Sequence, residues 1–242
     1  MGYEAFAGYY DFLTRNIDYN ELAVYYDRLN VKFGGERGIM LDLACGTGSL
    51  SVVLRDMGYD VIGTDISSEM LNIAVSKPHE GIEYLCQDMT ELDLFGTIDG
   101  TICSLDSINH LEDITAVSEA FKRVSLFSNK GALFMFDVNT LYKHEQVLGD
   151  NTFVYDTDEV YCVWQNEYQG DGVTDIYLDF FEERNGVYYR YSDEFSETAF
   201  SRESIEKMLV EAGFEVVACY EYLTENEPTE ESEKLTFVAR KK

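Results

Sequence analysis

Residues 40–48 read Met-Leu-Asp-Leu-Ala-Cys-Gly-Thr-Gly, and this stretch decides the fold. It has the composition of a buried strand, with one charge at Asp42, that runs directly into a glycine turn. Gly46 and Gly48 carry no Cβ, so the backbone can turn sharply there and a ligand can approach it closely. Residues 49–54 then begin a helix whose unpaired N–H groups face the same point. A strand, a glycine loop and a helix N-terminus together predict a nucleotide-type binding site.

Strands and helices alternate from this loop onward. The expected strands after the first cover residues 60–65, 82–87, 101–105 and 132–138. The expected helices between them cover residues 49–57, 67–74 and 113–126. This alternation predicts an α/β fold, a doubly wound Rossmann-like parallel sheet with right-handed crossovers. Ligands of such sheets bind outside the carboxyl ends of the strands, which is where the glycine loop lies.

Residues outside this run complete the expected fold. Aromatic and apolar residues recur twice at helical spacing within residues 3–33, so two helices are expected to cover the core. After the core resumes, a helix, a strand, an acidic loop and a last strand paired with the strand before it are expected over residues 201–211, 214–222, 225–233 and 235–240.

Residues 151–195 differ in character from the rest of the chain. They hold 12 aromatic and 11 acidic side chains against two arginines, and Asn185-Gly186 between apolar runs is a hairpin signal. We expect a small antiparallel β subdomain inserted after the fifth strand into a binding domain formed by residues 1–150 and 196–242, with residues 1–33 as its helical cover. The insertion is expected to be a lid over the acceptor site or the face of a homodimer.

The charge balance restricts the partners. The chain has 18 basic and 46 acidic side chains and a formal net charge of −28. Such an acidic protein repels phosphate backbones and anionic membranes, so neither nucleic acid nor membrane is expected as a partner. Residues 132–136 form the longest apolar run, too short to span a bilayer. The first residues lack the basic start and apolar stretch of a signal peptide, so a cytoplasmic location is expected.

The five cysteines indicate neither a disulfide framework nor a metal site. They are scattered, without a Cys-x-x-Cys pair or a histidine cluster at ligand spacing, so no metal is expected. This usage is typical of a reducing cytosol. Cys86 and Cys103 lie in apolar strand-like runs, where thiols are expected to be buried.

Two kinds of ribonucleotide cofactor fit the glycine loop. A nicotinamide site needs Gly-x-Gly-x-x-Gly/Ala, but here the third position is Ser51. Asp65, at the end of the second strand, would bind ribose hydroxyls in either kind of site. Asp42 can order the glycine turn and help hold an ammonium group, which a pyrophosphate would not need. Residues 87–89, Gln-Asp-Met, offer an acceptor for an adenine amino group and an apolar side chain for the ring.

These stretches resemble a known family. Residues 41–48, 63–71 and 86–89 are similar to the first three motifs of class I S-adenosylmethionine-dependent methyltransferases, and the whole chain resembles the small bacterial YqeM-like group. The resemblance implies S-adenosylmethionine as cofactor and a seven-stranded sheet with its last strand antiparallel.

The resemblance also implies roles for individual residues. Gly46 and Gly48 would approach the methionine part of the cofactor, and Asp65 would accept from both ribose hydroxyls. Ile66 and Met70 would flank the adenine, whose amino group would donate to Asp88. The remaining implied cofactor contacts are Tyr9, Arg15, Asp42, Ala44, Gln87, Met89, Leu105 and Asp106; Tyr10 would come close with Tyr9.

Methyl transfer from a sulfonium is an in-line displacement that depends chiefly on positioning, with a base where the acceptor carries a proton. His110 follows the fourth strand in a loop similar to that of sugar N,N-dimethyltransferases, which implies a base; a polar or helix-capping histidine is the alternative. Asp106, Asn109 and Asn139 are further candidates at this edge. His144 would reach the site only if the lid folds back, and His79 is expected in a solvated loop.

The sequence thus predicts an S-adenosylmethionine-dependent methyltransferase for a small-molecule acceptor with a nitrogen or oxygen nucleophile. The alternatives are a protein methyltransferase, an NAD(P)-dependent oxidoreductase and a non-catalytic S-adenosylmethionine-binding protein. The oxidoreductase is disfavoured by Ser51 and Asp42.

Overall fold

The core of the protein is a seven-stranded sheet in the order β10-β11-β5-β4-β1-β2-β3. The computed structural model describes residues 4–78, 80–157 and 160–242, so His79 lies outside the described residues. The strands of the core sheet are β1 (Ile39–Leu43), β2 (Asp60–Asp65), β3 (Ile82–Cys86), β4 (Ile98–Cys103), β5 (Ser128–Asn139), β10 (Phe214–Glu221) and β11 (Lys234–Lys241). β1 to β5 pair in parallel, whereas β11 runs antiparallel to both β5 and β10. The predicted doubly wound sheet with an antiparallel last strand is confirmed.

Helices cover both faces of this sheet. The helices are α1 (Glu4–Leu13), α2 (Tyr19–Lys32), α3 (Ser49–Asp56), α4 (Ser68–Ser76), α5 (Ile114–Phe127) and α6 (Arg202–Glu211). α5 and α6 bury their apolar sides in one core cluster, and α2 and α3 bury theirs in another. The strand order reverses between β1 and β4, which puts the ligand-binding crevice of such a fold outside the carboxyl ends of these two strands.

Several element ends follow local sequence signals. The side chains of Ser67, Asp113 and Ser201 accept backbone hydrogen bonds and cap α4, α5 and α6. Two predicted boundaries were wrong. β4 begins at Ile98 rather than at residue 101, and β5 begins at Ser128, within the expected turn, because Ile98 pairs with Ser128 across an irregular register.

The inserted residues form a second, four-stranded antiparallel sheet in the order β6-β7-β8-β9. Its strands are β6 (Thr152–Asp156), β7 (Tyr161–Gly170), β8 (Val173–Arg184) and β9 (Val187–Thr198). At the predicted hairpin, Asn185 and Gly186 both have positive φ, 55° and 78°. β9 continues three residues beyond the predicted end because it pairs with β8 along its whole length, up to Val173 with Thr198.

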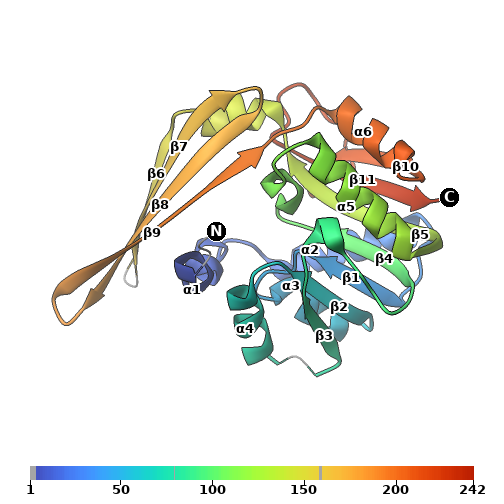
Figure 1. Cartoon of the computed structure of the whole chain (residues 1–242), viewed down its shortest axis with the longest axis horizontal. Coiled ribbons are helices and arrows are strands. Elements are labelled where there is room, and N and C mark those ends of the chain that lie inside the picture. The colour runs from blue at the N-terminus through green and yellow to red at the C-terminus, as the bar shows by residue number, and fades with distance from the viewer. Residues whose placement is uncertain (1–3, 79, 158–159) are drawn as a thin grey trace.

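The second sheet projects from the core, and α1 lies in the angle between them (Figure 1). Tyr9 of α1 stacks on Phe180 of β8, with ring centroids 4.7 Å apart, and its hydroxyl donates to Glu182 at 2.8 Å. Met70 of α4 belongs to the same apolar cluster. The N-terminal helix therefore joins the second sheet to the core.

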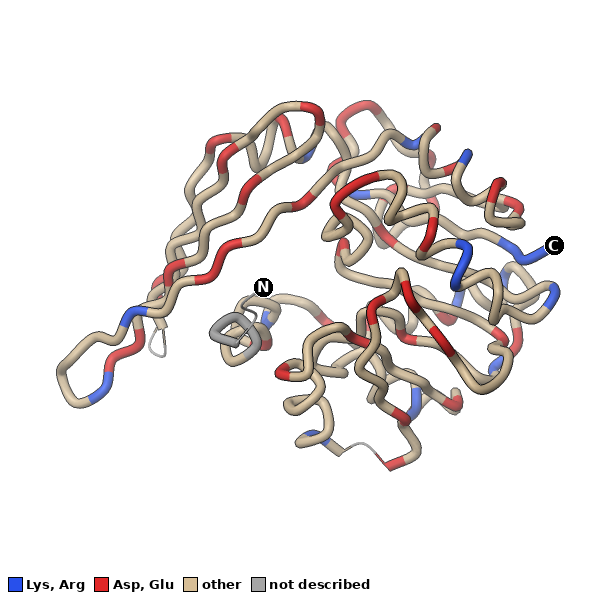
Figure 2. Tube along the Cα trace, in the orientation of Figure 1, with Lys and Arg blue, Asp and Glu red and all other residues tan. Residues whose placement is uncertain are grey.

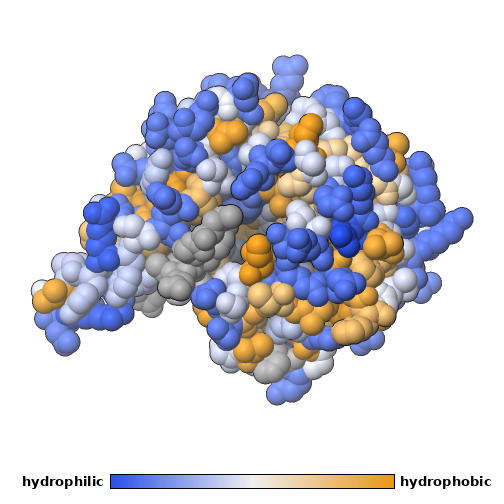
Figure 3. All heavy atoms as spheres, in the orientation of Figure 1, coloured by the Kyte–Doolittle hydropathy of each residue, from blue (hydrophilic) through white to orange (hydrophobic). Residues whose placement is uncertain are grey.

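The surface is hydrophilic and acidic. Asp and Glu are spread over both sheets and their loops, while Lys and Arg are few (Figure 2), and the face in Figure 3 is mostly hydrophilic with scattered apolar residues. No helix within the described ranges is long and apolar enough to cross a membrane. All five cysteines are free; Cys103 is buried as predicted, but Cys86 is exposed, because it ends the edge strand β3.

Candidate functional site

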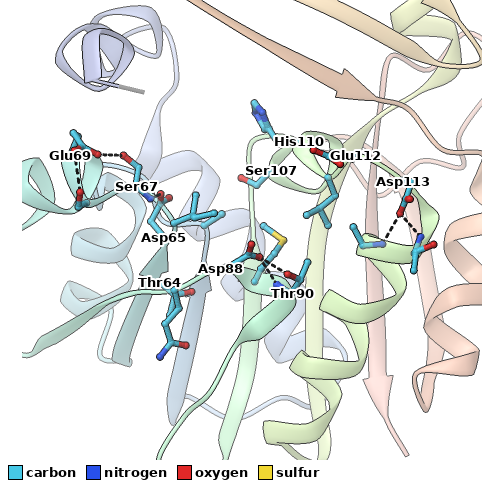
Figure 4. Close-up of a pocket in the computed structure, with 18 residues that line it drawn as sticks. Thr64, Asp65, Ser67, Glu69, Asp88, Thr90, Ser107, His110, Glu112 and Asp113 are labelled. Atoms are coloured by element: carbon cyan, nitrogen blue, oxygen red, sulfur yellow. Dashed lines mark hydrogen bonds between the residues drawn. The ribbon is translucent and has the colours of Figure 1, made fainter. Parts of the chain in front are cut away.

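Two adjoining cavities open at the carboxyl ends of the core strands. The larger, of about 700 Å³, lies between the ends of β2 and β3 and the start of α5 (Figure 4). The smaller, of about 370 Å³, extends towards α1 and the second sheet. The residues that line both are Ala44, Asp65, Ile66, Ser67, Met89, Ser107 and His110. The fold thus brings most of the predicted site residues to one continuous space.

The glycine loop and the end of β2 are held together by Asp65. The backbone of Ala44 and Gly46 is left-handed, with φ of 57° and 55°, and the Gly46 N–H donates to Asp65 Oδ2 at 2.8 Å. The Ser67 N–H donates to Asp65 Oδ1 at the same distance. Burial raises the pKa of Asp65, and these amides oppose the rise. Each carboxylate oxygen retains a lone pair for a ligand hydroxyl in the cavity.

Gly48 shapes the loop without lining either cavity. Its φ is 72°, and a Cβ at this position would come within 2.3 Å of the Tyr84 hydroxyl. We expect Gly48→Ala to destabilise the fold by about 2–3 kcal/mol, since it adds left-handed strain to a steric clash. Chemical denaturation measures this difference.

The clash component of that prediction can be separated from the backbone strain. In a Tyr84→Phe background, which lacks the clashing hydroxyl, Gly48→Ala should cost distinctly less free energy of unfolding. Equal costs in the two backgrounds would show that the Tyr84 hydroxyl plays no part.

Asp42 lies behind the loop. It is buried, accepts a hydrogen bond from the Ser51 hydroxyl of α3, and lines neither cavity. Burial raises the pKa of Asp42 to about 7, against the opposing effect of Ser51. The structure thus corrects the predicted direct contact with an ammonium group, because the carboxylate orders the loop from behind instead. This contact also gives Ser51, where a nicotinamide motif has glycine, a structural role.

The end of β3 presents polar and apolar side chains to the larger cavity. The Gln87 amide is committed to the backbone of Asp93 by two hydrogen bonds of 2.9 and 3.0 Å, so the structure disfavours it as an adenine acceptor. Asp88 Oδ1 accepts from the N–H and hydroxyl of Thr90, both at 2.8 Å. Asp88 lines the larger cavity, and in Figure 4 its carboxylate lies below Asp65 and Ser107. Met89 lines both cavities with Ile66.

The end of β4 is held by a buried carboxylate that the sequence analysis missed. Leu105 and Asp106 both have a φ of 57°, an uncommon conformation for residues other than glycine. Asp137 of β5 accepts from the N–H of Leu105 at 2.9 Å and of Asp106 at 2.8 Å. It also accepts from the Tyr26 hydroxyl at 2.8 Å. The strained turn brings Leu105 and Asp106 to the wall of the smaller cavity.

A second missed residue is Lys234, the first residue of β11. Its Nζ lies 3.3 Å from Asp137 Oδ1 and 3.4 Å from Asp106 Oδ1, and 4.8 Å from the centroid of the Tyr222 ring. Burial alone would raise the pKa of Asp106, but the positive charges of Lys234 and Lys143 hold it at about 2. The two carboxylates raise the pKa of Lys234. The single acidic residue in the apolar run 132–138 was the sequence signal for this network.

His110 stands where the two cavities meet. Its Nε2 lies 4.0 Å from Oε1 of Glu197, a buried residue of β9 that the sequence analysis also missed, and its Nδ1 is buried without a hydrogen-bond partner among the described residues. Asn139 Nδ2 donates to Glu197 Oε2 at 3.1 Å and to Asp106 Oδ2 at 2.6 Å. Burial and the charge of Asp106 raise the pKa of Glu197. His110 therefore faces a carboxylate from the second sheet without a hydrogen bond to it.

His144 and Asn109 support this region from behind. His144 is fully buried, with Nδ1 3.1 Å from the Thr174 hydroxyl and Nε2 3.6 Å from Glu197 Oε2. Burial and Lys143 lower the pKa of His144 to about 4. His144 packs beneath the second sheet and lines neither cavity, so it meets the site through Glu197. The Asn109 side chain donates to the backbone carbonyls of Asn139 and Thr198 and accepts from the N–H of Asn139.

The N-terminal helix contributes a different tyrosine from the one predicted. Tyr10, not Tyr9, lines the smaller cavity, and a Cβ on Gly46 would lie 3.7 Å from its ring. Tyr9 faces Phe180 and Glu182 instead. Arg15 is exposed and lies over the Phe12 ring at 4.6 Å, outside both cavities. Neither Tyr9 nor Arg15 therefore lines either cavity, because Tyr9 packs against the second sheet and Arg15, beyond the end of α1, lies over Phe12.

The described residues contain no group of three or more His, Cys, Asp or Glu that could hold a metal ion. The chemistry of this edge is that of carboxylates, amides, one half-buried imidazole and apolar walls. Such an arrangement can bind a ribonucleoside through hydroxyls and ring faces, and can position a second molecule beside it.

Comparison with known proteins agrees with this geometry. Residues 40–125 match the family model of a methyltransferase domain. The methyltransferase YqeM of Bacillus subtilis (strain 168) is 33% identical over 100% of this chain and 98% of its own length. The crystal structure of an S-adenosylmethionine-dependent methyltransferase from Clostridium acetobutylicum is 32% identical, with a TM-score of 0.90 over 99% of this chain and 98% of that one.

A more distant structure has the same fold. The amino pentose methyltransferase CalS10 of Micromonospora echinaspora, solved with S-adenosylmethionine bound, is 20% identical to this chain. Its TM-score is 0.78, over 100% of this chain and 98% of that one.

Proposed function

Because the chain belongs to the YqeM-like family of S-adenosylmethionine-dependent methyltransferases, we propose that it methylates a small molecule at a nitrogen or oxygen nucleophile. The observation that carries the proposal is the linkage of Gly46, Asp65 and Ser67 at the edge of the larger cavity. It presents a carboxylate to a ligand over a glycine loop, beside a second cavity with room for an acceptor.

The residues present fit the cofactor. Asp65 would accept from the ribose hydroxyls. Ile66 and Met89 would lie against the two faces of the adenine, in place of the predicted pair Ile66 and Met70, because Met70 lines only the smaller cavity. Asp88 would accept from its amino group, since its Oδ1 is bonded to Thr90 while the rest of the carboxylate lies at the cavity wall. The methionine end would extend towards Gly46, Leu105 and Asp106 in the smaller cavity, which these residues line together.

S-adenosylmethionine supplies an electrophilic methyl group on a sulfonium. The protein must hold the acceptor lone pair in line with the S–CH₃ bond, an effect worth several kcal/mol. His110 lies where the two cavities meet and would take up the acceptor proton or hold the acceptor by a hydrogen bond. The strained turn at Leu105 and Asp106, fixed by Asp137, would keep this wall rigid.

The position of the second sheet favours a role as a lid over a role as a dimer face. Tyr155, Trp164, Phe195 and Glu197 of this sheet line the smaller cavity together with residues of the core. A sheet that contributes four side chains to the acceptor side of the site is placed to enclose and select an acceptor.

The acidic surface favours a small molecule over RNA. More distant relatives include an 18S rRNA methyltransferase of Arabidopsis thaliana, 34% identical over only 41% of this chain. Binding of an RNA backbone needs basic side chains that neutralise phosphates, and this protein has a net charge of −28 (Figure 2). The likeness in fold to an amino pentose methyltransferase supports a small acceptor.

Calorimetric titration tests the cofactor assignment directly. S-adenosylhomocysteine is expected to bind with 1:1 stoichiometry, whereas NADH is not expected to bind, because Ser51 replaces the third glycine of a dinucleotide motif. Binding of NADH without S-adenosylhomocysteine would overturn the proposal. Tight S-adenosylhomocysteine binding without turnover of any small acceptor would favour a non-catalytic binding protein.

His110→Ala tests the acceptor side. We expect turnover, measured as S-adenosylhomocysteine released, to fall about 100-fold, in the range typical for a lost general acid or base. Cofactor affinity should change little, since Asp65 and the glycine loop remain. Full activity of the variant would show that His110 has only a structural role.

A further inference from the structure

We propose that Glu197 is the residue that binds the acceptor, and that the acceptor is an amine. The inference rests on the proposed methyl transfer and deepens it, since it names the acceptor class. It starts from the position of one carboxylate. Glu197 enters the smaller cavity from β9 of the inserted sheet, with its side chain only 7% exposed.

The two oxygens of Glu197 are used unequally. Oε2 accepts from Asn139 Nδ2 at 3.1 Å and lies 3.6 Å from His144 Nε2. Oε1 lies 4.0 Å from His110 Nε2, which is beyond hydrogen-bonding distance. No hydrogen bond from another described residue reaches Oε1. One oxygen is thus fixed by the protein, and the other remains open to a donor on a ligand.

Glu197 also differs from its neighbour Asp106 in charge compensation. Lys234 lies 3.4 Å from Asp106, whereas within the described ranges no lysine or arginine forms an ion pair with Glu197. A buried carboxylate without a cationic partner is costly. Burial of this carboxylate also raises the pKa of Glu197, because it disfavours the charged form. A ligand ammonium group would provide the missing positive charge.

The walls around Glu197 suit a cation. Tyr155, Trp164 and Phe195 line the same cavity and offer aromatic faces, which attract ammonium groups. Lys143 lies on this wall as well. Its charge partly opposes the raised pKa of Glu197, but its Nζ donates to Asn139 Oδ1 at 3.0 Å and forms no ion pair with Glu197 among the described residues. A carboxylate among aromatic rings is an arrangement typical of sites for amines.

A groove outside His110 has the matching charge. It lies between the residue 110–112 turn and the strands β8 and β9. The charged side chains that line it, apart from His110, are Glu112, Asp175 and Glu194, and all three are acidic. Such a groove raises the local concentration of a cationic ligand next to the cavity.

The chemistry balances with this assignment. The acceptor binds as an ammonium ion and gives one proton to Glu197, which leaves a neutral amine with a lone pair. The nitrogen then forms the N–C bond while the C–S bond of the methyl donor breaks and its electron pair stays on sulfur. The products are an N-methylammonium ion and S-adenosylhomocysteine, and the proton on Glu197 returns to solvent.

Binding of a simple probe tests the inference. Benzylammonium and its neutral counterpart benzyl alcohol are titrated into the S-adenosylhomocysteine complex and followed by NMR. We expect benzylammonium to bind and benzyl alcohol to bind at least about tenfold more weakly, since a charge-assisted hydrogen bond is lost. Equal affinities, or no binding of benzylammonium, would overturn the inference.

Two variants locate the effect. Glu197→Gln keeps an oxygen that can accept from Asn139 but removes the charge, so the preference for benzylammonium should disappear. In a panel of matched amines and alcohols, the rate of amine methylation by this variant should fall about 100-fold. Glu167→Gln, an exposed position on β7 of the same sheet, removes the same charge and should change neither. An unaltered preference in Glu197→Gln would overturn the inference.

The binding of S-adenosylhomocysteine separates the two proposals. If the unmodified protein binds S-adenosylhomocysteine but shows no preference for the amine, only the role of Glu197 is contradicted. If the unmodified protein does not bind S-adenosylhomocysteine at all, the proposed methyl transfer itself is contradicted. Thermal unfolding of Glu197→Gln confirms that the variant is folded before either result is read.

Discussion

Asp65→Ala is expected to weaken S-adenosylhomocysteine binding about 30- to 100-fold, which corresponds to about 2–3 kcal/mol. The variant loses the carboxylate proposed to accept from both ribose hydroxyls. It also frees the N–H groups of Gly46 and Ser67, each of which donates to this carboxylate at 2.8 Å. The loop and the ligand are therefore both affected. Isothermal titration calorimetry measures the change in affinity.

Asp60→Ala is the matched control for this prediction. Asp60 is the exposed first residue of β2, the strand that ends at Asp65. The substitution therefore removes the same charge at the opposite end of the same strand. The control should retain the affinity of the unmodified protein. If Asp65→Ala binds S-adenosylhomocysteine as tightly as Asp60→Ala does, the larger cavity does not hold the ribose.

Asp137→Asn is expected to lower the free energy of unfolding by about 3–5 kcal/mol, as for other buried charge networks that lose one member. Asp137 is fully buried and accepts from Tyr26 and from the backbone of Leu105 and Asp106, with Lys234 3.3 Å away. An asparagine has one acceptor oxygen in place of two, and its amide N–H groups would face these donors. Urea denaturation measures the loss.

Tyr26→Phe calibrates this prediction because it removes a single hydrogen bond from the same carboxylate. It should cost about 1 kcal/mol, far less than Asp137→Asn. Similar costs for the two variants would mean that the backbone turn and Lys234 draw little stability from Asp137. The left-handed turn at Leu105 and Asp106 would then need another source of support.

Local signals in the sequence predicted much of the fold. The glycine loop, the helix starts near Ser67 and Asp113 and the hairpin at Asn185-Gly186 each depend on residues within a few positions of one another. Their conformations follow from the missing Cβ of glycine and from short polar side chains that bond to nearby N–H groups. Such features need no knowledge of distant segments.

The errors arose where a distant segment decides which way a side chain faces. Tyr9 and Tyr10 are neighbours on one helix and point about 100° apart, so the choice between them depends on what covers α1. Tyr9 packs against Phe180 and Glu182 of the second sheet, so Tyr10 is the tyrosine that lines the cavity. In the same way, the position of Asp42 behind the loop depends on the hydrogen bond that it accepts from Ser51 of α3.

The sequence by itself placed Asp65, Asp88 and the glycine loop at one end of the sheet, because these residues directly follow the strands that position them. Only the tertiary structure revealed Asp137, Lys234 and Glu197. They come from β5, β11 and β9, and they meet because β11 pairs antiparallel with β5 and because the inserted sheet folds back over the strand ends. Long-range strand pairing sets such encounters, and no local propensity encodes it. The methyl donor can therefore be recognised in consecutive motifs, whereas the acceptor side is assembled from segments that only the fold brings together.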